Sequence, residues 1–479
     1  MISFWNGFII ATLLFIGWLI KSFYRQRNLP HGPMPLPIFG NLLILRKRAL
    51  QTLNNLATVY GSIFTIWLGR KPIVIVNDYN LAQEVLSKNG LKFSSRPDFM
   101  SSLLTRNRKR FPFMDYCPSF VNKQAICKDV CNADKLFLNT CLEIEIRQLT
   151  ELLMSQTAAK EFDPSEMIEK FAIDLLARVV YGMETDILFS ELNLPGHHDF
   201  VTLSNTTKML PWLRLLGMQR YRDYQKFMQN RERRLKSLFQ NSRKFGDSNA
   251  MIRKILKAFM EEANEQQIED AEILCSDLFI VGVENLAAAL KWILLYFVVW
   301  PEIQAKVQNE LDDKYGKTRN LTVEEAMSVP YLKAAVFEVL RLSSLNPLSS
   351  VHMSNESVTL KGHKLPKGTC VCVNLSAIHT SPKFWDNPFE FRPSRFLKNN
   401  EGVVMLRDIG LIKGFLPFGS GFRKCVSDEL SVKLMTTIIA NLTFNFDFSI
   451  PPWNMKPDLV GTTSFILVPR PYNVTVSSR

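Results

Sequence analysis

The chain has 479 residues, of which 47% are hydrophobic and 22% are charged, and it contains no internal repeat or low-complexity tract. This composition excludes a disordered polar chain and favours one large folded domain. The formal net charge of +13 indicates an anionic membrane surface or an acidic protein partner, and nucleic acid is disfavoured because no base-reading motif accompanies the charge.

The N-terminal stretch is almost entirely apolar over residues 4–20 and is followed by the basic residues Lys21, Arg25 and Arg27. About 17 helical residues span roughly 26 Å, close to the ~30 Å hydrocarbon core of a bilayer. A cleaved signal peptide is the alternative, but the charge follows the apolar run and no small-residue cleavage site comes after it. Residues 1–21 are therefore predicted to be a membrane anchor, with the rest of the chain on the cytoplasmic side.

Residues 22–41 are first basic and then rich in proline, which prevents helix formation and predicts a stiff hinge. Residues 42–479 contain no linker and are predicted to form one domain. Near its start, two β-rich runs at residues 63–68 and 73–76 flank the dipeptide Gly69-Arg70 and predict a hairpin.

The middle of the chain is predicted to be helical over residues 143–183 and 221–262. The stretch 220–244 is rich in arginine and lysine. A solvated helix face is the simplest interpretation of that charge, and contact with a membrane surface is the alternative.

A long apolar run from Asp270 to Trp300 has no proline before Pro301 and predicts one continuous helix. A second membrane span is the alternative, but the cost of inserting Glu284 and Lys291 offsets most of the gain from the aliphatic side chains. A core helix is preferred, with Glu284 and Asn285 facing a cavity.

Glu338 and Arg341 stand at i and i+3 in the next predicted helix, close enough to pair on one face. The β-rich stretch 370–375 follows, and then the tetrapeptide Pro393-Ser394-Arg395-Phe396. These features predict short strands between two arginine-bearing segments.

The run from Phe418 to Ser427 contains two glycines, Arg423 and Cys425, and it precedes a predicted helix over residues 428–441. At a helix N-terminus, amide donors and nearby positive charge push a thiol toward the thiolate, the form that binds a soft metal. An inert buried cysteine is the alternative. The other cysteines lack zinc-site spacing, and the scattered thiols predict core positions and a reducing compartment.

Phe418, Gly421, Arg423 and Cys425 keep the spacing F-x-x-G-x-R-x-C, which resembles the haem-binding loop of the cytochrome P-450 family, with Ser427 where that family has a second glycine. Glu-x-x-Arg and Pro-x-Arg-Phe are similar to the family's buried Glu-Arg-Arg network, and the proline-rich hinge to that of its microsomal members. The resemblance extends along nearly the whole chain. It implies the mainly α P-450 fold with a small β region, and haem b (iron protoporphyrin IX) with Cys425 as the axial thiolate.

The resemblance also assigns roles to residues elsewhere. Arg96, His352 and Arg423 match positions that donate to haem propionates, whereas Phe120 and Gln124 occupy the places of a donor Trp and Arg. The segment 281–286 is similar to the family's oxygen-activation motif. It keeps Gly282 and Glu284, but Asn285 and Leu286 replace the usual threonine and the next hydroxyl, and an amide cannot relay a proton as an alcohol can.

The resemblance implies a monooxygenase of the endoplasmic reticulum membrane. It would insert oxygen from O2 into a lipophilic substrate, with electrons from NADPH-cytochrome P-450 reductase and optionally cytochrome b5, and with Glu284 and Asn285 as catalytic residues. Asn285 leaves open a haem-thiolate isomerase of hydroperoxides or endoperoxides that needs no reductase. A non-catalytic haem-binding sensor is a third possibility.

Overall fold

A computed structural model of the protein describes residue 17 and residues 27–45, 48–97, 106, 108–132, 134–158, 161–192, 218–259, 265–316, 320–400, 403–463 and 466–479. The predicted membrane anchor at residues 1–21 lies outside this part of the chain, apart from residue 17.

The secondary structure is mainly helical, as predicted. The helices are α2 (Ala49–Tyr60), α3 (Tyr79–Gln83), α5 (Pro118–Cys131), α6 (Lys135–Gln156), α7 (Ser165–Tyr181), α8 (Phe189–Leu192), α10 (Met218–Phe245), α11 (Met251–Phe259), α12 (Glu265–Val299), α13 (Pro301–Tyr315), α14 (Val323–Met327), α15 (Pro330–Ser343), α16 (Leu375–His379) and α17 (Asp428–Asn445). The strands are β1 (Ile63–Leu68), β2 (Lys71–Val76), β3 (His352–Met353), β4 (Val358–Leu360), β5 (His363–Leu365), β6 (Cys370–Val373), β7 (Leu397–Asn400), β8 (Val403–Leu406), β9 (Phe446–Ser449), β10 (Thr462–Thr463), β11 (Leu467–Val468) and β12 (Thr475–Ser478). Single turns of 3₁₀ or π helix lie at Glu84–Lys88, Phe111–Phe113, Pro393–Phe396, Ile409–Leu411 and Gly421–Arg423.

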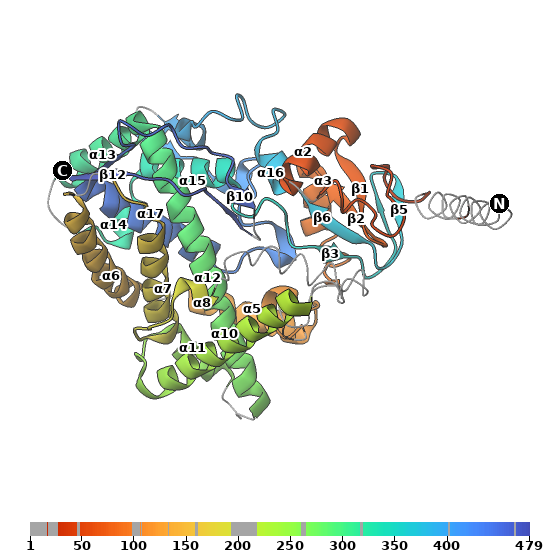
Figure 1. Ribbon diagram of the computed structural model, residues 1–479, viewed down its shortest axis with the longest axis horizontal. Helices are drawn as coiled ribbons and strands as arrows, with labels where there is room; N and C mark the ends of the chain where they lie inside the picture. Colours follow the sequence, from red (N-terminus) through yellow and green to blue (C-terminus); the bar gives the residue numbers. More distant parts are fainter. Residues whose placement is uncertain are drawn as a thin grey trace, which may run out of the picture.

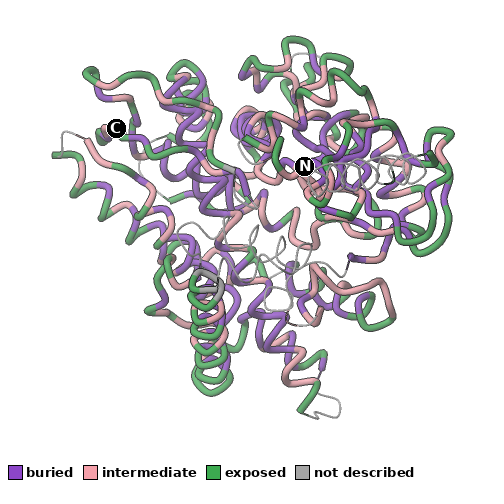
Figure 2. The backbone as a smooth tube through the Cα atoms, turned by 45° about the vertical axis from the view of Figure 1, so that its right-hand side comes forward, coloured by how far each residue is buried: buried purple, intermediate pink, exposed green. Residues whose placement is uncertain are grey.

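Helix α12 runs through the helical part of the molecule and packs against α7, α11, α15 and α17 (Figure 1). It is long and apolar enough to cross a membrane, but 72% of its most apolar window is buried inside the protein. This burial agrees with the predicted core helix. Figure 2 shows the same distribution, with buried residues along the central helices and exposed residues on the outer ones.

The main sheet has the strand order β1-β2-β6-β3 and lies at the opposite end of the molecule from α6 and α13 (Figure 1). The predicted hairpin is confirmed: β1 and β2 are antiparallel, with Ile63 opposite Val76, and Gly69 at φ 61° makes the turn. Strand β6 is parallel to β2, so that Cys370 lies opposite Ile73. The sheet therefore joins the beginning of the domain to a segment close to the cysteine loop.

Two predicted helical regions are each divided in two. The region 143–183 is interrupted before Ser165, because a residue that precedes a proline, here Asp163, is disfavoured in the helical conformation. The region 221–262 breaks at Gly246, where a Cβ atom would collide with the backbone carbonyl oxygen of Tyr181. Both interruptions allow helices to turn and cover α12.

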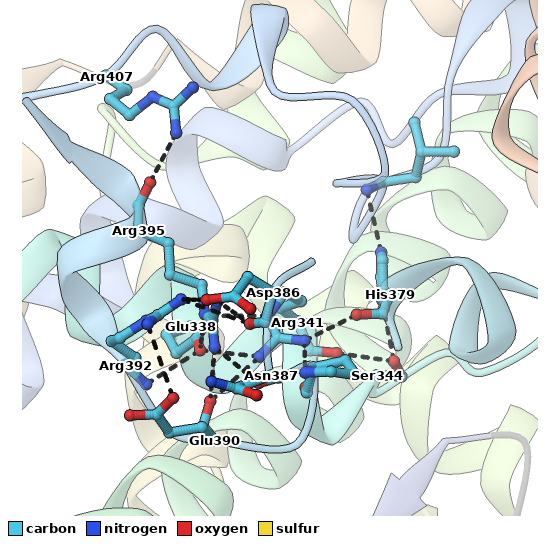
Figure 3. A network of polar contacts seen from close by, with 12 residues as sticks. Glu338, Arg341, Ser344, His379, Asp386, Asn387, Glu390, Arg392, Arg395 and Arg407 are labelled. Atoms are coloured by element: carbon cyan, nitrogen blue, oxygen red, sulfur yellow. Dashed lines mark hydrogen bonds and ion pairs between the residues drawn. The ribbon is translucent and has the colours of Figure 1, made fainter. Parts of the chain in front are cut away.

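The Glu338–Arg341 pair is confirmed and lies completely buried. Glu338 accepts hydrogen bonds from Arg341 Nε (2.7 Å) and Arg395 Nε (2.8 Å), as Figure 3 shows. His379, at the end of α16, connects this network to the cysteine loop. Its Nε2 accepts from the Leu416 N–H at 3.0 Å, and its Nδ1 therefore donates to Ser344 Oγ. The network fixes the base of the loop that carries Cys425.

Six of the eight cysteines are buried: Cys127, Cys131, Cys141, Cys275, Cys370 and Cys372. In the described parts of the chain, no group of three His, Cys, Asp or Glu side chains is placed to hold a metal ion. The prediction of core thiols is thus confirmed for these six.

Candidate functional site

One cavity of about 370 Å³ lies between α5, α7, α12, the segment after α15 and the loop that carries Cys425. Its wall includes Cys425 and Phe418 from the loop and Gly282 and Asn285 from α12. Residues that are far apart in the sequence, and that resemble separate motifs, therefore surround one space.

The cysteine loop is held in shape by its own backbone and by two glycines. The Cys425 N–H donates to the Phe418 carbonyl oxygen at 3.0 Å. Gly419 and Gly421 have φ values of 70° and 69°, a conformation that residues with a Cβ rarely adopt. At Gly421 a Cβ would also collide with the backbone carbonyl of Leu86, so the loop can pack closely against the Glu84–Lys88 turn only with glycine there.

The thiol of Cys425 does not have the lowered pKa that the sequence predicts. Burial raises its pKa, and hydrogen bonding to Ser427, whose Oγ lies 3.5 Å from the sulfur, acts in the opposite direction. The prediction considered the helix terminus but not the burial of the sulfur in the cavity wall. A metal ion would have to displace the thiol proton when it binds.

Arg423 fits an anionic group at the cavity. Its Nη2 donates to the carbonyl oxygens of Ser94 (2.6 Å) and Met114 (2.7 Å), whereas its buried Nε and Nη1 have no partner in the described structure. Burial lowers the pKa of Arg423 to about 10, so the side chain is still charged at neutral pH. A buried cation with open N–H groups is what a haem propionate requires, and together with the Cys425 sulfur it makes the cavity suitable for haem.

Arg96 and His352 also line the cavity, but part of their hydrogen-bonding capacity is already used. Arg96 donates through Nε to the Pro112 carbonyl (3.1 Å) and through Nη1 to the Val351 carbonyl (3.0 Å). His352 Nδ1 lies 3.0 Å from the Phe93 carbonyl oxygen and must carry a proton to bond it. Burial and the charge of Arg96 lower the pKa of His352 well below its ordinary value.

Phe120 and Gln124 take up new contacts in the places of the missing Trp and Arg. The Phe120 ring lies under the Arg423 guanidinium, whose Cζ is 4.0 Å from the ring centroid. Gln124 Nε2 donates to the Phe422 carbonyl at 2.8 Å. Both residues therefore support the cysteine loop: one holds the arginine and the other holds the backbone beside it.

The two polar residues in the middle of α12 have different surroundings. Asn285 lines the cavity, and its Nδ2 donates to the Val281 carbonyl oxygen at 2.8 Å. Glu284 was predicted to face the cavity as well, but it is not among the lining residues. Burial raises the pKa of Glu284 to about 7, and the nearby guanidinium groups of Arg231 and Arg110 act in the opposite direction.

Asn346, in the loop after α15, was not identified from the sequence, although its Nδ2 donates to Asn285 Oδ1 at 2.9 Å and it lines the cavity. The buried Arg110, which forms ion pairs with Asp277 and Glu232, was missed too. Both pairings join distant segments, and neither has a local spacing that would indicate it.

Comparison with known proteins identifies the family. The family model for cytochrome P450 matches residues 30–476. Cytochrome P450 2U1 of Mus musculus is 27% identical and covers 98% of this chain and 94% of its own length, and salutaridine synthase of Papaver somniferum is 29% identical with 97% and 94% covered. A zebra fish cytochrome P450 structure with abiraterone superposes with a TM-score of 0.76 at 25% identity, covering 90% of this chain and 99% of that one.

The fold, the cysteine loop and the match over nearly the entire sequence lead to the same assignment. The chain belongs to the cytochrome P450 family of haem-thiolate monooxygenases, in which a cysteine thiolate ligates the haem iron.

Proposed function

We propose that this protein inserts one oxygen atom from O2 into a lipophilic substrate, with electrons delivered by NADPH-cytochrome P-450 reductase and optionally by cytochrome b5. The observation that carries the proposal is that Cys425 and three residues of α12, Val281, Gly282 and Asn285, line one cavity. When bound, haem b supplies the redox chemistry that activates dioxygen. Cys425 would ligate its iron, and Arg423 would bind a propionate.

The remaining lining residues determine what else the cavity can hold. Leu278, Val281, Leu286, Ala289 and Leu348 give it aliphatic walls. Such walls exclude water and bind apolar molecules through burial of their surface. They support a lipophilic substrate.

The proposal includes a place in the cell. Residues 1–21 anchor the chain in the endoplasmic reticulum membrane, residues 22–41 act as the hinge, and residues 42–479 form the haem domain on the cytosolic side. An acidic reductase would dock near the cysteine loop, where Lys424 is half exposed and forms an ion pair with Asp428 at 2.5 Å. The net charge of +13 supports an anionic partner.

The test begins with the purified holoenzyme. Reduction under carbon monoxide should produce the red-shifted Soret band of a thiolate-ligated haem, and Cys425→Ala should abolish it. Cys127→Ala is the matched control, because Cys127 lines the same cavity and should leave the band unchanged. NADPH consumption with reductase should then yield oxygenated product. If the protein converts hydroperoxides but forms no product with reductase, NADPH and O2, the monooxygenase assignment is refuted.

Asn285 favours a second candidate, a haem-thiolate isomerase of hydroperoxides or endoperoxides. Its NH2 group donates to the Val281 carbonyl, its oxygen accepts from Asn346, and an amide is a poor proton relay. Replacement of Asn285 by threonine separates the two functions. A gain in product formed per NADPH supports an impaired monooxygenase, whereas simple loss of peroxide turnover supports the isomerase.

A further inference from the structure

Asn285 and Asn346 form a pair of side-chain amides whose orientation is determined by their partners. The Val281 carbonyl can only accept, so the group that faces it at 2.8 Å must be the NH2 of Asn285. The Asn285 oxygen then faces Asn346, which must present its own NH2 at 2.9 Å. The contact with a backbone carbonyl thus fixes both amides.

This orientation leaves unused hydrogen-bonding capacity at the cavity. The carbonyl oxygen of Asn346 has no protein donor in the described part of the chain, and each NH2 group has one further hydrogen. Ser349, which also lines the cavity, differs: its Oγ accepts from the Val373 N–H at 2.9 Å and donates to the Ser350 carbonyl at 3.2 Å. The amide pair therefore offers both an acceptor and donors to a ligand.

The surroundings of the pair are apolar. Leu278, Leu286, Ala289, Leu345 and Leu348 line the same cavity. A polar group of the substrate loses its hydrogen bonds to water when it enters the cavity, and beside these apolar walls it cannot replace them unless it contacts the pair. A hydrogen bond at the pair would consequently orient a largely apolar molecule as well as bind it.

We propose that the Asn285–Asn346 pair recognises the hydroxyl group of an otherwise apolar substrate. The hydroxyl hydrogen is donated to Asn346 Oδ1, and the hydroxyl oxygen accepts from a remaining amide N–H. An alcohol complements both functions of the pair, a ketone complements only the donors, and a hydrocarbon complements neither. This inference rests on the proposed function and names the substrate class of the same site.

The experiment is an optical titration of the holoenzyme with borneol, camphor and bornane, which share one skeleton and differ in the oxygen group. Each affinity is measured in the wild type and in Asn346→Leu, and comparison of the same ligands in both proteins cancels their different solubility in water. Asn346→Leu should reduce the preference for borneol over bornane about fivefold, the typical net value of a neutral hydrogen bond. Leu278→Val, which trims the aliphatic wall, should weaken both ligands by the same factor.

A second variant gives an independent readout. Asn346→Asp removes a donor, which costs borneol and camphor one hydrogen bond each, but it also converts the acceptor to a carboxylate, whose bond from a hydroxyl is stronger because it is charge-assisted. Borneol should therefore retain its affinity, whereas camphor should lose affinity. An unchanged ratio of borneol to bornane in Asn346→Leu, or equal losses of borneol and camphor in Asn346→Asp, would overturn the inference. The carbon monoxide spectrum of each variant is recorded separately, so that failure of thiolate ligation is distinguished from failure of hydroxyl recognition.

Discussion

Replacement of Glu338 by glutamine should strongly destabilise the fold, although it preserves the shape of the side chain. Glu338 is fully buried and accepts from Arg341 Nε (2.7 Å), Arg341 Nη2 (2.8 Å), Arg395 Nε (2.8 Å) and the Arg392 N–H (3.1 Å). The amide would remove the charge and direct an NH2 group at donors. Loss of about two charge-assisted hydrogen bonds at ~1.5–3 kcal/mol each gives a loss of about 3–6 kcal/mol, which agrees with the ~3–5 kcal/mol usual for breaking a buried ion pair.

The assay is urea unfolding of the holoenzyme followed by circular dichroism, and the change in free energy is taken from the shift of the midpoint. The matched control is Glu143→Gln on α6. Glu143 also pairs with an arginine, Arg147 at 3.1 Å, but both side chains are about 60% exposed. That substitution should cost about 0.3 kcal/mol. Equal effects of the two substitutions would refute the reasoning, because burial would then make no difference.

Three further outcomes are expected. Gly421→Ala should prevent stable folding or haem uptake, measured by soluble yield and the Soret band. At Gly419 nothing lies within 4 Å of an added Cβ, so Gly419→Ala should lose only the free energy of holding an alanine in the left-handed conformation. An equal loss of soluble yield and Soret band in both variants would contradict the steric argument. The pKa of Glu284 is raised from 4.5 to about 7, so between these pH values the folded state holds a proton that the unfolded state releases. The stability of the wild type should therefore fall relative to that of Glu284→Gln as the pH rises from 4.5 to about 7. Parallel stability profiles of the two proteins would exclude the raised pKa. Phe120→Ala should accelerate haem transfer to apomyoglobin, because it removes the ring under Arg423, and such a contact contributes about 2 kcal/mol when desolvated. An unchanged transfer rate would show that the Phe120 ring does not help Arg423 to hold the haem.

The features that the sequence predicted well depend on local spacing. The pairing of Glu338 with Arg341 follows from their separation on one helix, and the β1–β2 hairpin follows from a glycine turn between β-branched runs. The long apolar helix was also predicted, although α12 begins five residues earlier, at Glu265, because a polar first turn has no hydrophobic signal. Local chemistry was sufficient for these elements.

The remaining features depend on contacts between distant segments. Burial of Cys425 reversed the expected direction of its thiol pKa, and that burial comes from the packing of the whole cavity wall. The partial use of Arg96 by backbone carbonyls and the pairing of Asn346 with Asn285 are likewise set by tertiary structure. No periodicity or motif in a single sequence predicts such contacts between distant segments.

The parallel pairing of β2 with β6 has a consequence for biosynthesis. Near the ends of these strands, Asn374 Nδ2 donates to Asn77 Oδ1 at 3.0 Å across a separation of 297 residues. At a typical translation rate of ~5–20 residues per second, the free edge of β2 would wait about 15–60 s for its partner to leave the ribosome. During that time the edge can pair with another nascent chain, so chaperones that cover exposed strand edges should decide how much of this protein matures.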